Sequence, residues 1–149
     1  MNNDDKWMQL AINEAKLAKI NDEIPVGAVI IQNGVLISQA HNRPISSNDA
    51  TAHAEIEVIR KAGQALQNYR LIDSTLYVTL EPCLMCLGAI IHARIKRIVF
   101  GAYDTKNPIN ITYQDFKKTT LQNHKIIING GILEKNCQHL LQSFFKLRR

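Results

Sequence analysis

Two stretches decide the fold and chemistry of this chain: Thr51-Ala52-His53-Ala54-Glu55 and, further along, Glu81-Pro82-Cys83-Leu84-Met85-Cys86. The imidazole of His53 and the thiols of Cys83 and Cys86 are ligand types that zinc prefers. A zinc ion with three protein ligands keeps its fourth position for water, as catalytic sites do. Glu55 follows His53 closely enough to exchange a proton with that water. We therefore interpret the two stretches as a hydrolytic zinc centre.

The spacing of these residues constrains where they lie on their helices. Cys83 and Cys86 are three positions apart, so at a helix start both thiols can project to one side. His53 and Glu55 are about 200° apart around an ideal helix, so they can approach one metal only at the first turn. Thr51 is a plausible N-cap for that helix. We expect two helix N-termini to converge on the zinc, where their positive ends lower the thiol pKa values.

The surrounding pattern predicts alternating helices and strands. A helix capped by Asp4 or Asp5 should end near Ile20, and Asn33-Gly34 is a strong hairpin signal. Later strands alternate with helices, which favours parallel pairing. The predicted fold is a three-layer α/β/α sandwich around a mixed sheet of about five strands, with the first hairpin antiparallel and the rest parallel. The predicted strands span 26–31, 35–39, 76–80, 98–100 and 126–128, and the later helices span 52–66, 82–94 and a C-terminal segment beyond 131.

Length and composition are those of one globular domain over residues 1–149, with 46% apolar and 21% charged residues. No apolar run approaches the ~20 residues that span a bilayer. The acidic N-terminus lacks the apolar segment of a signal peptide. Three cysteines, two of them in Cys-x-x-Cys, argue against a disulfide framework and for a reducing cytoplasm. The net charge of +5 points mildly to a polyanionic partner.

Two other uses of these motifs are less well supported by the spacing. A structural zinc site needs a fourth ligand, and none of the remaining candidates lies at knuckle spacing from His53. Redox chemistry at Cys-x-x-Cys fits poorly with the preceding proline and the upstream His-x-Glu. In the hydrolytic interpretation Glu55 takes the proton of the water and delivers it to a ring nitrogen and a leaving amine, which is deamination. The remaining candidates for the fourth ligand of a structural zinc site are His41, His92, His124, His139 and Cys137.

The His-x-Glu and Pro-Cys-x-x-Cys motifs resemble the signature of the zinc nucleobase deaminases. Over nearly its whole length the chain resembles one branch of that superfamily, the bacterial tRNA-specific adenosine deaminases. That resemblance implies a cytidine deaminase-like fold. It is densest in Pro25-Val26-Gly27-Ala28-Val29, His41-Asn42-Arg43-Pro44, Asn68-Tyr69-Arg70-Leu71-Ile72-Asp73, Thr75-Leu76-Tyr77-Val78-Thr79-Leu80-Glu81-Pro82-Cys83, Val99-Phe100-Gly101-Ala102 and Phe144-Phe145-Lys146-Leu147-Arg148-Arg149.

By this resemblance the protein would convert the wobble adenosine of a tRNA anticodon, in an arginine tRNA, to inosine. It would act as a homodimer with the anticodon loop across the interface. One Zn²⁺ per subunit would be held by His53, Cys83 and Cys86, with Glu55 as proton shuttle. The resemblance also implies substrate-binding roles in three groups: Asn42 on the flipped nucleotide with Val26, Ala54, Leu80 and Glu81 around it; Asp104 and Lys106 on neighbouring nucleotides with Asn123 in support; and Lys146, Arg148 and Arg149 on phosphates.

Several alternatives stay open at this point. Asn42 can be a turn residue, Asp104 a loop cap, and the terminal basic cluster a solvated helix end. Residues 107–113 lack the glycines and alanines that family members usually carry, so this loop should follow a different backbone path. Two other functions compete: a deaminase of free guanine, cytosine or adenine or of nucleosides, and a non-catalytic RNA-binding subunit with structural zinc. Glu55 argues against the second, because such a subunit does not need a proton shuttle.

Overall fold

The centre of the molecule is a mixed sheet whose described strands follow the order β2-β1-β3-β4-β5. The computed structural model of the protein describes residues 2–106, 108–109, 113–114 and 125–148. The strands are β1 (Gly27–Gln32), β2 (Val35–His41), β3 (Ser74–Leu80), β4 (Arg97–Ala102) and β5 (Ile127–Asn129). The helices are α1 (Asn3–Ile20), α2 (Pro44–Ser47), α3 (Ala54–Leu66), α4 (Leu84–His92) and α6 (Glu134–Leu147).

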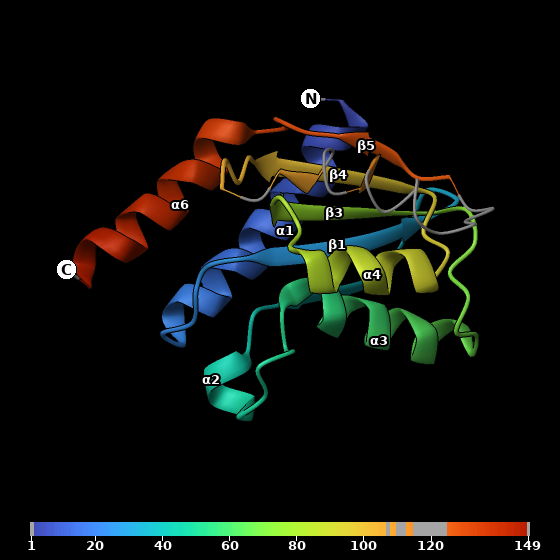
Figure 1. Cartoon of the computed structure of the whole chain (residues 1–149), viewed down its shortest axis with the longest axis horizontal. Coiled ribbons are helices and arrows are strands. Elements are labelled where there is room, and N and C mark those ends of the chain that lie inside the picture. Colours follow the sequence, from blue (N-terminus) through green and yellow to red (C-terminus); the bar gives the residue numbers. More distant parts are fainter. Residues whose placement is uncertain (1, 107, 110–112, 115–124, 149) are drawn as a thin grey trace.

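Helices cover both faces of the sheet, with α3 and α4 on one face and α1 and α6 on the other (Figure 1). The alternation of side chains along β1 explains the two cores. Ala28 and Ile30 pack with α3 and α4, whereas Val29 and Ile31 pack with α1. Because both faces are covered, β1 reads as a continuous apolar run and not as an alternating one. The predicted three-layer sandwich is confirmed.

The sheet is mixed because β1 runs against both of its neighbours. It pairs antiparallel with β2 and with β3, and β3, β4 and β5 are parallel to one another. Asn33 and Gly34 both have positive φ, at 52° and 75°, as a type I′ hairpin turn requires. The antiparallel β1–β3 pairing was not predicted. The turn chemistry marks the hairpin, but it does not say which of its two strands joins the rest of the sheet.

Three predicted helix starts are wrong. Asn2 caps α1, with its side chain accepting from the Asp5 amide at 2.8 Å, while Asp4 and Asp5 lie inside the first turn. The N-cap of α3 is His53 and not Thr51, whose amide and hydroxyl both donate to Asp49. Helix α4 does not begin at Pro82; its N-cap is Cys83, with extended backbone. In both α3 and α4 a predicted metal ligand occupies the N-cap position.

The segment between β2 and α3 is less irregular than predicted. Residues 45–49 were expected to form a polar loop, but Pro44–Ser47 form the single turn α2. Its first amides donate to the carboxylate of Glu23, which lies after the end of α1. This contact ties α2 to the turn that follows α1. Across the described residues, no helix combines the length and the apolar character needed to cross a membrane.

Candidate metal centre and active site

The side chains of His53, Cys83 and Cys86 converge, with their ligand atoms within 4.8 Å of one another. His53 Nδ1 lies 3.6 Å from Cys83 Sγ and 3.5 Å from Cys86 Sγ. A tetrahedral zinc ion with Zn–N of about 2.0 Å and Zn–S of about 2.3 Å places its nitrogen and sulfur ligands about 3.5 Å apart. The donor types and their spacing therefore both fit zinc.

The starts of two helices supply all three ligands. His53 is the N-cap of α3 and Cys83 the N-cap of α4, and both have extended φ and ψ. Cys86 lies in the first turn of α4 and is fully buried. The extended caps turn the side chains of His53 and Cys83 off the helix ends, where the two positive helix termini meet. The predicted convergence of two helix N-termini is thus formed by the starts of α3 and α4. The positive ends of their helix dipoles favour anionic ligands at the site.

The two thiols differ in their ionisation. The hydrogen bond from Cys86, followed by that from His53, lowers the pKa of the Cys83 thiol to about 4 despite its partial burial. The pKa of Cys86 is raised, first by its hydrogen bond to Cys83 and then by burial. The pKa of His53 is raised by its hydrogen bond with Cys83. One thiolate is thus available at neutral pH, and a divalent cation would favour ionisation of the second.

Glu55 is the buried acid of the site. It is the second residue of α3 and only 4% exposed. Its carboxyl is in hydrogen-bonding contact with Cys86. Burial raises the pKa of Glu55 to about 7, while its own backbone amide and His53 oppose that rise. A carboxyl whose pKa lies near neutrality can both accept and release a proton, which suits general acid and base catalysis.

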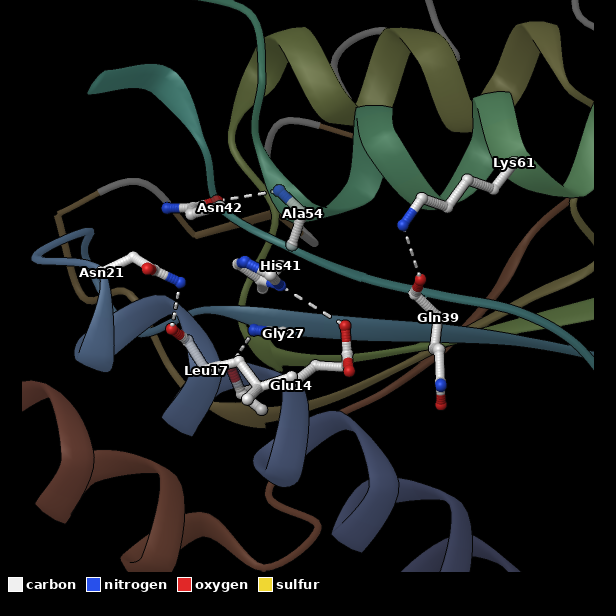
Figure 2. Close-up of polar contacts among 10 residues, drawn as sticks. Glu14, Leu17, Asn21, Gly27, Gln39, His41, Asn42, Ala54 and Lys61 are labelled. Carbon is white, nitrogen blue, oxygen red and sulfur yellow. Dashed lines mark hydrogen bonds and ion pairs between the residues drawn. The ribbon is translucent and has the colours of Figure 1, made fainter. Parts of the chain in front are cut away.

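Asn42 caps α3 from outside that helix. Its Oδ1 accepts the Ala54 amide at 2.8 Å, and its own amide donates to the Val26 carbonyl at 3.1 Å. Figure 2 shows the amide nitrogen of Asn42 pointing away from Ala54. Asn42 is 7% exposed. Because the bond to Ala54 uses only Oδ1, the predicted turn role and the predicted nucleotide contact are compatible. One end of the amide is fixed by α3, and the other is a donor.

Glu81, which the resemblance places around the base, accepts two backbone hydrogen bonds. It is 4% exposed, and its two oxygens accept the amides of Asp104 at 2.7 Å and Ile109 at 2.6 Å. The Asp104 side chain in turn accepts the Lys106 amide at 3.1 Å. Asp104 is therefore a local cap as well as a candidate RNA contact, and Lys106 is exposed beside it.

The other predicted substrate residues are more widely spread. Val26 and Ala54 are buried beside Asn42, and Leu80 is half-buried at the end of β3. Lys146 lies in the last turn of α6. The Arg148 guanidinium pairs with Asp22 at 2.8 Å and lies 3.7 Å from the centroid of the Phe144 ring. Asn123, Arg149 and the candidate ligand His124 lie outside the described residues, as does most of the atypical 107–113 segment.

Two buried acids near the site were missed by the sequence reasoning. Glu14 on α1 pairs with His41 Nδ1 at 3.4 Å, which ties the end of β2 to α1 (Figure 2). Glu23 holds α2, as described above. Glu14 could have been found, because it falls on the buried stripe of α1 between Ala11 and Ala18. No pattern marks Glu23, because its partners are backbone amides.

Comparison with known proteins agrees with this geometry. Residues 1–102 match the family described as the cytidine and deoxycytidylate deaminase zinc-binding region. A tRNA-specific adenosine deaminase from Buchnera aphidicola subsp. Schizaphis graminum is 43% identical over 156 aligned residues, covering 99% of this chain and 97% of its own length. The chain belongs to the tRNA-specific adenosine deaminase family. As a member of a zinc-binding deaminase family it uses zinc, and His53, Cys83 and Cys86 are the described residues that can hold the ion.

Solved structures of related deaminases share its fold. A structure from work on A-to-I editing by tRNA:A34 deaminases at the wobble position has a TM-score of 0.84 and 42% identity, covering 91% of this chain and 99% of that one. A guanine deaminase from Bacillus subtilis has a TM-score of 0.66 and 39% identity, covering 76% of each chain. The predicted cytidine deaminase-like fold is confirmed.

Proposed function

We propose that the protein removes the amino group of adenosine by hydrolysis, which gives inosine. Its target is the wobble position of the anticodon in an arginine tRNA. The observation that carries this proposal is the buried Glu55 in contact with a three-ligand cluster of zinc-like spacing. The choice of substrate is supported by full-length similarity to tRNA-specific adenosine deaminases. The proposed reaction replaces the exocyclic amino group with oxygen from water and releases ammonia.

The chemistry divides between the metal and the protein. His53, Cys83 and Cys86 would hold the zinc ion, which when bound would supply a Lewis acid able to lower the pKa of water toward about 7. Glu55 accepts a proton from the attacking water, donates it to the ring nitrogen, and then carries a second proton to the leaving amine. Its burial keeps bulk water from competing for those protons. Burial raises the pKa of this carboxyl, which suits it to return a proton as well as to accept one.

The surrounding residues position the base and the RNA. Asn42 donates from Nδ2 to the flipped nucleotide, because its Oδ1 is already occupied by the Ala54 amide. An anticodon loop already splays its bases, so extrusion of the target is inexpensive. Val26, Ala54 and Leu80 surround the base. Asp104 and Lys106, with Asn123, contact neighbouring nucleotides, and Lys146, Arg148 and Arg149 contact phosphates.

We further propose a homodimer with the anticodon loop across its interface. Sedimentation of the purified protein tests this directly, since a monomer at assay concentrations would contradict it.

The free thiols of Cys83, Cys86 and Cys137 support a reducing, cytoplasmic location.

Guanine deamination is the second candidate, because a guanine deaminase is 39% identical over 76% of this chain. The deciding assay incubates the purified protein with an arginine tRNA bearing a wobble adenosine and measures inosine, with free guanine, cytosine and adenine as controls. Inosine in the tRNA and no release of ammonia from the free bases is the expected result. Glu55→Ala should keep its zinc and lose inosine formation, and loss of zinc would instead assign Glu55 a structural role.

A further inference from the structure

Glu81 joins two parts of the chain that the proposed reaction uses for different purposes. It directly follows β3 and precedes the zinc ligand Cys83 by two residues. The two amides that it accepts, from Asp104 and Ile109, come from the segment after β4. The Glu81 amide also donates to the Ala102 carbonyl at 2.9 Å, at the end of β4. The Glu81 backbone therefore bonds to the last residue of β4, and its side chain attaches the segment after β4 to the turn that carries Cys83.

The bonding pattern requires a carboxylate. Each oxygen of Glu81 faces a backbone N–H at hydrogen-bond distance, and the side chain is almost fully buried. Hydrogen bonds to an ionised acceptor are stronger than those between neutral groups. An amide in the same place would present one NH₂ group to an N–H, so one of the two bonds would be lost and two donors would face each other. Position 81 is thus sensitive to the exchange of a single atom.

We propose that Glu81 is a positioning residue that fixes residues 104–106 relative to Cys83, and thereby sets the affinity for RNA without touching the reacting atoms. This inference rests on the proposed function, in which Asp104 and Lys106 contact the nucleotides beside the target. The Asp104 amide donates a hydrogen bond to Glu81, and the Asp104 side chain accepts one from the Lys106 amide. A chain of two hydrogen bonds therefore leads from the zinc-ligand turn to the Lys106 backbone.

Glu23 offers a matched control within the same protein. It is 1% exposed, and its two oxygens also accept two backbone amides, from Ile45 at 3.1 Å and Ser46 at 2.7 Å. It holds α2, whose residues have no proposed RNA contact. Glu23→Gln and Glu81→Gln thus make the same chemical change at two buried carboxylates that each accept two backbone amides, although Glu23 also bonds to the Ser46 side chain. The difference between them isolates what the post-β4 segment contributes.

The test measures kinetics on an anticodon stem-loop with zinc-loaded protein. For Glu81→Gln the KM should rise about tenfold, which corresponds to the loss of one hydrogen bond to a charged group, with kcat and zinc content unchanged. Glu23→Gln should leave KM close to wild type. A fall in kcat at unchanged KM, or an equal rise of KM in both variants, overturns the proposal. If Glu81→Gln does not fold, Glu81→Asp, which keeps the charge on a shorter side chain, takes its place with the same expected split.

A double-mutant cycle with Lys106→Ala tests the route of the effect. If Glu81 acts by placing Lys106, then Lys106→Ala should raise KM less in the Glu81→Gln background than in wild type. Strictly additive effects on log KM would contradict the proposed route.

Amide hydrogen exchange separates this proposal from the proposed function. Loss of protection at Asp104 and Ile109 in Glu81→Gln is expected whatever the substrate is, and unchanged protection overturns the positioning role. Failure of wild-type protein to form inosine in tRNA would instead overturn the proposed function.

Discussion

Replacing Asn42 in two different ways should separate its structural role from its proposed role in binding. Asn42 Oδ1 accepts the Ala54 amide at 2.8 Å, and Ala54 is fully buried, so water cannot replace that acceptor. Asn42→Ala should therefore leave a buried N–H unsatisfied, at a loss of about 2 kcal/mol. For a chain of this size that corresponds to a fall of about 4–8 °C in the unfolding midpoint.

Asn42→Asp makes the complementary change. A carboxylate keeps an acceptor for the Ala54 amide and carries a negative charge at the N-terminus of α3, where such a charge is favourable. The unfolding midpoint should stay within about 2 °C of wild type, because the hydrogen bond to the Ala54 amide is kept. The amide donor is lost, however, so binding of the target nucleotide should weaken in both variants.

The measurements are thermal unfolding of the zinc-loaded protein and KM for a tRNA anticodon stem-loop. Gln39→Ala is the control, because Gln39 is exposed on β2, the strand that ends just before Asn42 (Figure 2). We expect Asn42→Ala to lose both stability and binding, Asn42→Asp to lose binding alone, and the control to lose neither. An Asn42→Ala variant that unfolds at the wild-type temperature would refute the assignment of Asn42 as the cap of α3.

Three further outcomes are expected. Gly27→Ala should destabilise the protein by at least about 2 kcal/mol in urea titrations, because the added Cβ would overlap the Ala11 carbonyl oxygen of α1; a wild-type midpoint would show that α1 can move away. The hydrogen bond from Arg97 lowers the pKa of Asp4 below its ordinary value, so the stability that Asp4 contributes is present above about pH 4 and is lost as the pH falls through the folded-state value. The stability difference between wild type and Asp4→Asn should accordingly shrink between pH 6 and 3 in urea titrations, and a constant difference would contradict this. Chelation should remove one zinc per chain, abolish deamination and lower the unfolding midpoint, and full activity in protein shown to be metal-free would rule out a catalytic metal.

The metal ligands and Glu55 could be predicted because their chemistry is carried by residue type. Few side chains other than imidazole and thiolate suit zinc, so His53, Cys83 and Cys86 stand out in the sequence. The layers of the fold were predictable for a similar reason, since buried helices and strands leave an apolar pattern. The hairpin between β1 and β2 follows from the positive φ values that Asn33 and Gly34 accept readily.

The starts of α3 and α4 could not be predicted because the metal-ligand residues His53 and Cys83 occupy their N-cap positions. A Ser, Thr, Asp or Asn before a helix is expected to accept an amide of the first turn. At α3 the N-cap is His53, and its side chain makes no capping hydrogen bond and is turned toward the thiols instead. The free amide at Ala54 is satisfied by Asn42, twelve residues earlier in the chain. A rule that reads only neighbouring residues therefore selects Thr51, which belongs to a separate turn.

The buried carboxylates Glu23 and Glu81 show a second limit of prediction from the sequence. Their hydrogen-bond partners, and not the carboxylates themselves, are what the sequence does not mark. Each accepts two backbone amides from a distant segment. Every residue except proline carries such an amide, so no residue type in the partner segment marks the contact in the sequence. Side chains that bind the metal or transfer protons can be recognised one at a time, whereas those that hold a loop are recognised only from the folded chain. The resemblance implied pocket lining for Glu81, and the folded chain adds the two hydrogen bonds by which its carboxylate holds the amides of Asp104 and Ile109.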